Sequence, residues 1–294
     1  MTEQPNHRTA AERVGLIGIG LMGTALAERL LAAGFRVVGW DLDPARGEAL
    51  RQLGGEPVAG ASEVLARCDR VLLSLPTLEV VADVLRTAHA PLRGGLLLVD
   101  TSTGDPRQAI ELGRQLASHG AVYLDATISG SSAQVRAGEV VVMVGGAAEA
   151  VARCGDLLST FAREVIHTGP CGTGAQMKLV TNLVLGLNRA ALAEGIAFAR
   201  ALGLDAARTL EILRAGTAYS RIMDTKGAKM VGGDFTPQAK LAQHLKDVRL
   251  ILDAGEAAGA TLPLSATHRA LLELAESRGF GDADNSAIIR AYDP

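Results

Sequence analysis

Residues 14–23, VGLIGIGLMG, decide the fold of this chain, because they join a strand pattern to a helix pattern through closely spaced glycines. The apolar run Val14–Ile19 predicts a strand, and the Ala- and Leu-rich stretch Leu21–Ala33 predicts a helix. The spacing is G-x-G-x-x-G. Its first glycine permits a tight turn, the second lets the backbone approach a pyrophosphate, and the third lets the helix pack closely on the strand. The predicted dinucleotide-binding turn therefore consists of Gly18, Gly20, Leu21, Met22 and Gly23.

The same alternation of short apolar runs and longer helical patterns continues through the first half of the chain. Strands are predicted at Arg36–Trp40, Arg70–Leu75, Gly95–Asp100, Val122–Asp125 and Val140–Val144, and helices at Pro44–Leu53, Glu79–Leu85 and Pro106–Ser118. Strands that alternate with helices of this length form right-handed β-α-β crossovers. We therefore expect a mainly parallel sheet.

The pattern changes after about residue 170. Thr173–Leu202 contains no proline and keeps helical spacing, which predicts a helix about 45 Å long. Further helices are predicted at Asp205–Ala215, Ser220–Met230, Lys240–Ala258 and Leu264–Ser277. The fold class is thus α/β, with an N-terminal Rossmann-type parallel-sheet domain at 13–172 and an all-α C-terminal domain at 173–294, joined by the long helix. Since one small bundle cannot cover so long a helix, we expect a homodimer or homotetramer.

Composition excludes several classes of protein. The 294 residues carry 29 basic and 32 acidic side chains, a net charge of −3, which gives no electrostatic footprint for nucleic acid or an anionic membrane. The three cysteines are far apart, and no histidine pair has metal-ligand spacing, so no metal is expected. His119, His167, His244 and His268 are expected at the surface or in loops. A polar, frayed arm at residues 1–12 lacks a secretory signal, which favours a cytoplasmic protein.

The second predicted strand is followed by Asp41, 18 residues after Gly23. This is close to the spacing of the acid that binds an adenosine ribose, and a carboxylate there repels a 2′-phosphate. We therefore expect NAD as the cofactor, with NADP left possible because Arg46 lies nearby. The alternative is that Asp41 only caps the following turn. Asp43, which precedes Pro44, is interpreted as a helix N-cap.

Two further segments follow predicted strands at their carboxyl ends, where an open α/β sheet binds its ligands. Leu75 and Pro76 end one strand, and a Ser/Thr-rich segment containing Thr103 follows another. We expect Leu75, Pro76 and Thr103 to contact the cofactor. A helix-capping loop before Pro106 is the alternative for Thr103.

Four separated motifs resemble those of the β-hydroxyacid dehydrogenases, which include 3-hydroxyisobutyrate dehydrogenase and tartronate semialdehyde reductase. The resemblance extends from about Arg13 to Tyr292. Its motifs are GLIGIGLMG at 15–23, DATISG at 125–130 (similar to D-A-P-V-S-G), GTGAQMKLVTN at 172–182 (similar to G-x-G-x-x-x-K-x-x-x-N) and the pair Lys246-Asp247 after Phe235.

The resemblance implies an NAD(P)-dependent enzyme that interconverts a small 3-hydroxy acid and its semialdehyde. Lys178 would be the proton donor and acceptor, because an ammonium supplies both a proton and a positive charge to a developing alkoxide. Asn182, four residues later, lies on the same helix face and would orient the lysine or bind substrate. Ser129 and Gly130 would bind the substrate carboxylate, and Lys246 would approach cofactor or substrate. Phe235 shields the nicotinamide or packs in the core, and Asp247 anchors a neighbouring lysine or helix.

The chain departs from the family pattern at Thr127, where proline is usual, and at Ser131-Ser132, where further glycine is common. These departures leave acid binding in place but leave the exact substrate open. Two alternatives remain. An imine reductase has the same two domains but generally lacks the lysine, and a non-catalytic dinucleotide-binding module would bind cofactor without turnover.

Overall fold

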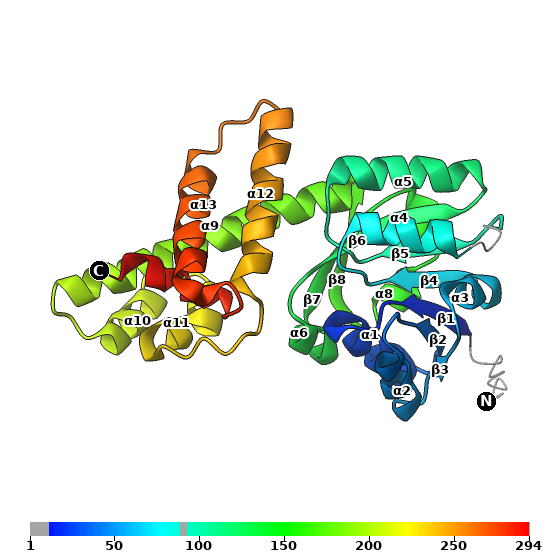
Figure 1. Cartoon of the computed structure of the whole chain (residues 1–294), viewed down its shortest axis with the longest axis horizontal. Helices are drawn as coiled ribbons and strands as arrows, with labels where there is room; N and C mark the ends of the chain where they lie inside the picture. The colour runs from blue at the N-terminus through cyan, green and yellow to red at the C-terminus, as the bar shows by residue number, and fades with distance from the viewer. Residues whose placement is uncertain (1–11, 89–92, 294) are drawn as a thin grey trace, which may run out of the picture. The chain divides into compact units, whose positions relative to one another are not determined.

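The computed structural model describes residues 12–88 and 93–293, so the predicted N-terminal arm lies, apart from Glu12, outside the described residues. The chain divides into two compact units, Met1–Lys178 and Leu179–Pro294. Figure 1 shows a sheet flanked by helices in the first unit and only helices in the second. The functional boundary that we propose, between residues 172 and 173, differs from this division only in where the first turn of the long helix belongs.

The first unit contains an eight-stranded sheet in the order β3-β2-β1-β4-β5-β6-β7-β8. Neighbouring strands are parallel except for the antiparallel pair β6 and β7. The chain order reverses between β1 and β4, which is where an open sheet of this type binds its ligand. The strands are β1 (Arg13–Ile17), β2 (Arg36–Trp40), β3 (Glu56–Pro57), β4 (Arg70–Leu73), β5 (Leu97–Asp100), β6 (Val122–Ser129), β7 (Val140–Gly145) and β8 (Ala162–Gly169).

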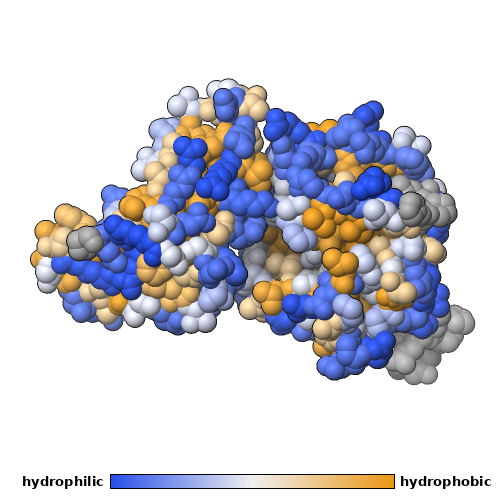
Figure 2. All heavy atoms as spheres, viewed as in Figure 1, coloured by the Kyte–Doolittle hydropathy of each residue, from blue (hydrophilic) through white to orange (hydrophobic). Residues whose placement is uncertain are grey.

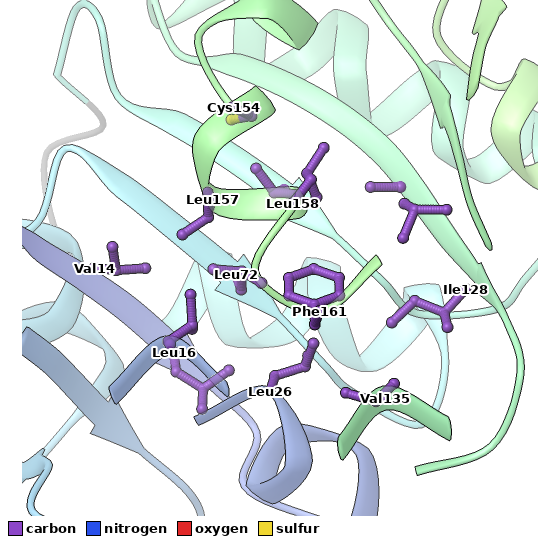
Figure 3. Close-up of a cluster of buried hydrophobic side chains, with 14 of the residues drawn as sticks. Val14, Leu16, Leu26, Leu72, Ile128, Val135, Cys154, Leu157, Leu158 and Phe161 are labelled. Carbon is purple, nitrogen blue, oxygen red and sulfur yellow. The ribbon is translucent and has the colours of Figure 1, made fainter. Parts of the chain in front are cut away.

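Helices cover both faces of this sheet, and each face has its own apolar core. One core takes side chains from α1 (Leu21–Ala32), α2 (Pro44–Gln52), α6 (Ser132–Ala137), α7 (Ala148–Ala152) and α8 (Gly155–Leu158). Figure 3 shows part of it, with Phe161 among leucines and valines from several elements. The other core takes side chains from α3 (Ala61–Arg67), α4 (Leu78–Thr87) and α5 (Pro106–Ser118). The predicted parallel-sheet architecture is confirmed.

Local sequence explains where several of these helices begin. The Asp43 carboxylate accepts a hydrogen bond from the Ala45 N–H, with Pro44 in the first turn of α2, as predicted. Asp105 caps α5 in the same way. The predicted strand Val122–Asp125 proved too short, since β6 continues to Ser129, and β3 and β8 were not predicted.

The second unit is helical, as expected. The structure describes α9 (Thr173–Ala201), α10 (Ala206–Ala215), α11 (Ile222–Gly232), α12 (Leu241–Ala257) and α13 (Pro263–Ala275), then a π-helical turn and a 3₁₀ helix at Asn285–Tyr292. The polar centre of this unit is Asp284, which is fully buried and forms a 2.8 Å ion pair with Lys226. Hydrogen bonds from the Gln238 and Ser286 N–H groups also reach the Asp284 carboxylate.

The prediction that His244 and His268 lie at the surface or in loops is wrong. Both are buried, on α12 and α13, and their ring centroids are 5.2 Å apart. They pack against Gly186 of α9, where an added Cβ would lie 2.6 Å from His268 Cε1. Burial, reinforced by the Arg189 guanidinium, lowers the pKa of His268 to about 4. An imidazole at that pKa is neutral at pH 7, so it behaves as a core side chain.

Polar residues cover most of the visible surface of each unit, with apolar patches between them (Figure 2). Among the helices of the described residues, none is both long and apolar enough to cross a membrane.

Candidate active site

The glycine-rich turn joins β1 to α1 in a conformation that two of its glycines make possible. Gly18 has a φ of +93°, and a Cβ there would lie 2.3 Å from the Ser74 carbonyl oxygen. A Cβ at Gly23 would lie 2.0 Å from the Gly18 carbonyl oxygen. Both positions therefore exclude side chains because the chain itself fills the space.

Gly20 differs, because a Cβ added there would meet no atom within 4 Å. It is the N-cap of α1, provides no side-chain cap, and is followed by a first turn without an acidic residue. The space beside the Gly20 Cα, at the start of α1, is thus not filled by the protein. A pyrophosphate fits this arrangement in charge and in closeness of approach.

Asp41 lies directly after β2 and contacts the turn. Its Oδ2 accepts a 2.6 Å hydrogen bond from the Ile19 N–H, and its Oδ1 accepts one of 2.9 Å from the Asp43 N–H. The carboxylate is therefore fixed beside the glycine turn, as a ribose ligand must be. The capping alternative also holds in part, since the Asp43 contact stabilises the turn.

The ends of β4 and β5 lie beside each other because these strands pair in parallel. The Leu75 N–H donates to Ser102 Oγ at 3.1 Å, which ties the two following loops together. The Ser102 hydroxyl therefore has a structural contact, while Thr103 is half-buried in the same loop and Pro76 is exposed. At the end of β5, burial raises the pKa of Asp100, whose Oδ2 accepts a hydrogen bond from the Tyr123 hydroxyl.

The end of β6 and the start of α9 bring two of the sequence motifs together. Lys178 Nζ donates a 2.7 Å hydrogen bond to the Ile128 carbonyl oxygen, one residue before Ser129. Gly130 follows with a φ of +151°, and a Cβ there would lie 2.5 Å from Val140 Cγ1. The predicted lysine and the predicted carboxylate-binding pair are thus neighbours in space.

Ser131, one of the departures from the family pattern, is the N-cap of α6. Its hydroxyl accepts from the Gln134 N–H and the Gln134 side chain accepts from the Ser131 N–H, which is a capping box. The serine therefore starts a helix. Its hydroxyl contact gives no reason to add it to Ser129 and Gly130 as a substrate ligand.

Asn182 lies on α9 one turn beyond Lys178 and is buried. Its Nδ2 donates to Asp247 Oδ2 at 3.1 Å, so Asp247 of α12 anchors α9 through Asn182. Lys246 precedes it on the same helix. Phe235 packs edge-to-face on Phe280, with the rings 6.1 Å apart, as a core aromatic does.

Sequence reasoning missed a buried arginine in the second unit. Arg189 is 3% exposed, and burial lowers its pKa to about 10 although Asp284 and Asp247 oppose the shift. The available signal was its place on the buried stripe of α9, after Asn182 and Gly186 and before Ala193.

An open glycine turn at the switch point of a Rossmann-type sheet, followed by a helical unit, is the architecture of a dinucleotide-binding protein. Comparison with known proteins agrees. The NAD binding domain of 6-phosphogluconate dehydrogenase matches residues 13–169, and the NAD-binding domain of NADP-dependent 3-hydroxyisobutyrate dehydrogenase matches residues 172–292.

Similar proteins align along almost the whole chain. L-threonate dehydrogenase of Cupriavidus necator is 32% identical over 96% of this chain and 96% of its own length. 2-hydroxy-3-oxopropionate reductase of Escherichia coli is 31% identical over 96% and 97%. The structure of Mycobacterium tuberculosis 3-hydroxyisobutyrate dehydrogenase with L-serine superposes with a TM-score of 0.88 at 30% identity, covering 97% of this chain and 100% of that one.

The chain belongs to the β-hydroxyacid dehydrogenase family. It is an NAD(P)-dependent oxidoreductase of the hydroxyacid dehydrogenase type.

Proposed function

We propose that the enzyme interconverts a small 3-hydroxy acid and its semialdehyde, with Lys178 as the proton donor and acceptor. The observation that carries this proposal is the 2.7 Å hydrogen bond from Lys178 Nζ to the Ile128 carbonyl oxygen. It holds an ammonium next to Ser129 and Gly130, whose hydroxyl and N–H groups can bind a carboxylate. A hydroxy acid needs both groups, one at its carboxylate and one at its hydroxyl.

The nicotinamide cofactor, when bound, supplies or accepts the hydride. During reduction, the Lys178 ammonium stabilises the developing alkoxide and donates a proton to it. During oxidation, the neutral Lys178 amine accepts the proton of the substrate hydroxyl. Asn182, whose amide nitrogen donates to Asp247, would orient the lysine or the substrate.

Loss of Lys178 tests this mechanism. K178A should lower kcat by about 10²–10⁴-fold, the usual contribution of a general acid or base, with the Kd for NADH nearly unchanged. Lys240 is an exposed lysine paired with Asp282, and K240A is the matched control with unchanged turnover. Near-normal turnover by K178A would contradict the proposed function.

NAD is the proposed cofactor in preference to NADP, because Asp41 places a carboxylate beside the turn where a 2′-phosphate would meet it. The further residues proposed to contact the cofactor are Leu21, Met22, Leu75, Pro76, Thr103 and Lys246. Measuring turnover with NADH and with NADPH tests the proposed preference for NAD, and faster turnover with NADPH would contradict it. D41N should reduce the ratio of turnover with NADH to turnover with NADPH.

The substrate class is testable with a panel of tartronate semialdehyde, methylmalonate semialdehyde, succinate semialdehyde, L-threonate and a cyclic imine. We expect the highest kcat/KM with a three- or four-carbon acid, as the names of the similar enzymes suggest. Turnover of the imine alone would favour an imine reductase. Tight NADH binding without any turnover would favour a non-catalytic module.

We also propose a homodimer or homotetramer in the cytoplasm. A groove of about 560 Å³ in the second unit is lined by α9, α13 and Tyr292, and its Phe198 and Leu264 are 63% and 67% exposed. In a two-fold pair, each copy would present the same patch to the other. Sedimentation should show an oligomer that F198E dissociates and that I212E, at an exposed apolar position of α10, does not. A monomeric wild-type protein would refute it.

A further inference from the structure

We infer that Asp125 and Thr127 are positioning residues, which fix the Lys178 ammonium by holding the first turn of α9 against strand β6. This inference rests on the proposed role of Lys178. We call the contacts of Asp125, Thr127 and Ile128 with residues 172–178 the β6–α9 clamp; Figure 1 shows the two elements it joins.

The Asp125 carboxylate makes the first contact of the clamp. Its Oδ1 accepts a 2.8 Å hydrogen bond from the Gly172 N–H, and its Oδ2 accepts one of 2.8 Å from the Ala175 N–H. These N–H groups lie at the N-terminus of a 29-residue helix, where no carbonyl of the helix can reach them. One buried side chain therefore satisfies two donors and fixes both the position and the rotation of the first turn.

Two glycines let the strand, the helix and this carboxylate approach one another closely. A Cβ at Gly145 would lie 2.4 Å from Asp125 Oδ1, and a Cβ at Gly174 would lie 2.2 Å from the Asp125 carbonyl oxygen. The strand backbone and the helix backbone are thus in direct contact. A small movement of the helix would break hydrogen bonds that nothing else can replace in this packed interior.

Thr127 makes the second contact, from the next residue on the same face of β6. Its buried hydroxyl donates to the Gly174 carbonyl oxygen at 2.9 Å. The motif D-A-P-V-S-G has proline at this position, and proline has no hydroxyl to donate. In this chain the departure from the motif therefore adds a bond between strand and helix.

The third contact, between the Lys178 ammonium and the Ile128 carbonyl oxygen, connects the clamp to the proposed catalytic group. Gly174 precedes Lys178 by one helical turn, so the strand holds both the start of this turn and, through the Ile128 carbonyl, the ammonium at its end. The Lys178 ammonium is consequently held in register with Ser129, the next residue of β6. Catalytic groups misplaced by about 1 Å can cost 10²-fold in rate, so this register matters for turnover.

The test is a double-mutant cycle with K178A, measured as NADH oxidation with the best semialdehyde of the panel and with high enzyme concentrations for the slow variants. T127V keeps the side-chain shape and removes the hydroxyl, and it should lower kcat two- to tenfold with unchanged NADH affinity. T127S should restore kcat. D125N, which turns one acceptor into a donor facing an N–H group, should lower kcat ten- to a hundredfold.

In the K178A background, neither T127V nor D125N should lower kcat further, because the clamp acts through the lysine. T160V is the matched control: it removes a hydroxyl that donates to the Leu157 carbonyl at 2.8 Å in the same unit, and it should leave kcat unchanged. If T127V lowers kcat equally in both backgrounds, or leaves it unchanged, the inference fails while the role of Lys178 stands. If K178A itself is active, the proposed function fails. Should D125N not fold, T127V and T127S still decide.

Discussion

Replacing Gly20 by alanine should weaken cofactor binding much more than it weakens the fold. The Gly20 backbone has a φ of −70°, which alanine adopts freely, and an added Cβ would meet no protein atom within 4 Å. The free energy of unfolding should therefore fall by only about 1 kcal/mol, because alanine is a weaker N-cap than glycine.

The cost should appear in binding. A methyl group at Gly20 occupies the space through which a pyrophosphate approaches the N–H groups of α1. Loss of one charge-assisted hydrogen bond costs about 1.5–3 kcal/mol. That loss corresponds to a rise of roughly 10- to 150-fold in the Kd for NADH.

Fluorescence titration with NADH and thermal unfolding, measured on the same preparations, check both halves of this prediction. G155A is the control, since a Cβ at Gly155 also meets nothing within 4 Å but lies far from the turn in sequence, at the start of α8. G23A is the contrast. Its Cβ would lie 2.0 Å from the Gly18 carbonyl oxygen, so we expect it to lose both stability and binding.

Wild-type NADH affinity in G20A would show that the pyrophosphate does not approach this glycine, which refutes the reading of the turn. A loss of stability as large as that of G23A would show instead that the space beside Gly20 belongs to the protein.

Two other predictions concern the second unit. The unfolded chain protonates His268 near pH 6.5, but the folded protein does so only near pH 4, so the free energy of unfolding falls by up to about 3 kcal/mol as the pH falls through that window. Urea titrations at pH 7.5 and 4.5 should show a smaller loss of stability for H268Q than for the wild type. Equal losses would contradict the buried, neutral state of His268. D284N leaves the buried Lys226 ammonium without its carboxylate and should cost about 3–5 kcal/mol in the same assay. D282N, which breaks the exposed pair with Lys240, should cost less than about 1 kcal/mol, and similar losses in both variants would argue against a special role for Asp284.

Features that depend on neighbouring residues were predictable from the sequence. The glycine turn and the Asp43 cap follow from backbone conformations that only a few residue types favour, so the patterns identify them without knowledge of the fold. The long helix was also predictable, because its apolar spacing extends over many turns.

Features set by contacts between distant segments could not be predicted from the sequence. Nothing beside His244 or His268 in the sequence indicates that Gly186, on another helix, lets both rings pack in the interior. The role of Thr127 could not be predicted for the same reason. Its departure from the motif was visible, but its meaning depends on a carbonyl 47 residues away, at Gly174.

Helix caps distinguish the start of α1 from the starts of α2, α5 and α9. Aspartate side chains accept from the first N–H groups of α2, α5 and α9, so the positive ends of these helices are already paired with a carboxylate. At α1 the cap is Gly20, and the first turn has no acidic residue. We therefore propose that the start of α1 binds the cofactor phosphates. The start of α9 is closed by Asp125, which supports the proposal that Ser129 and Gly130 beside it bind the substrate carboxylate and that α9 contributes the Lys178 ammonium instead of its dipole.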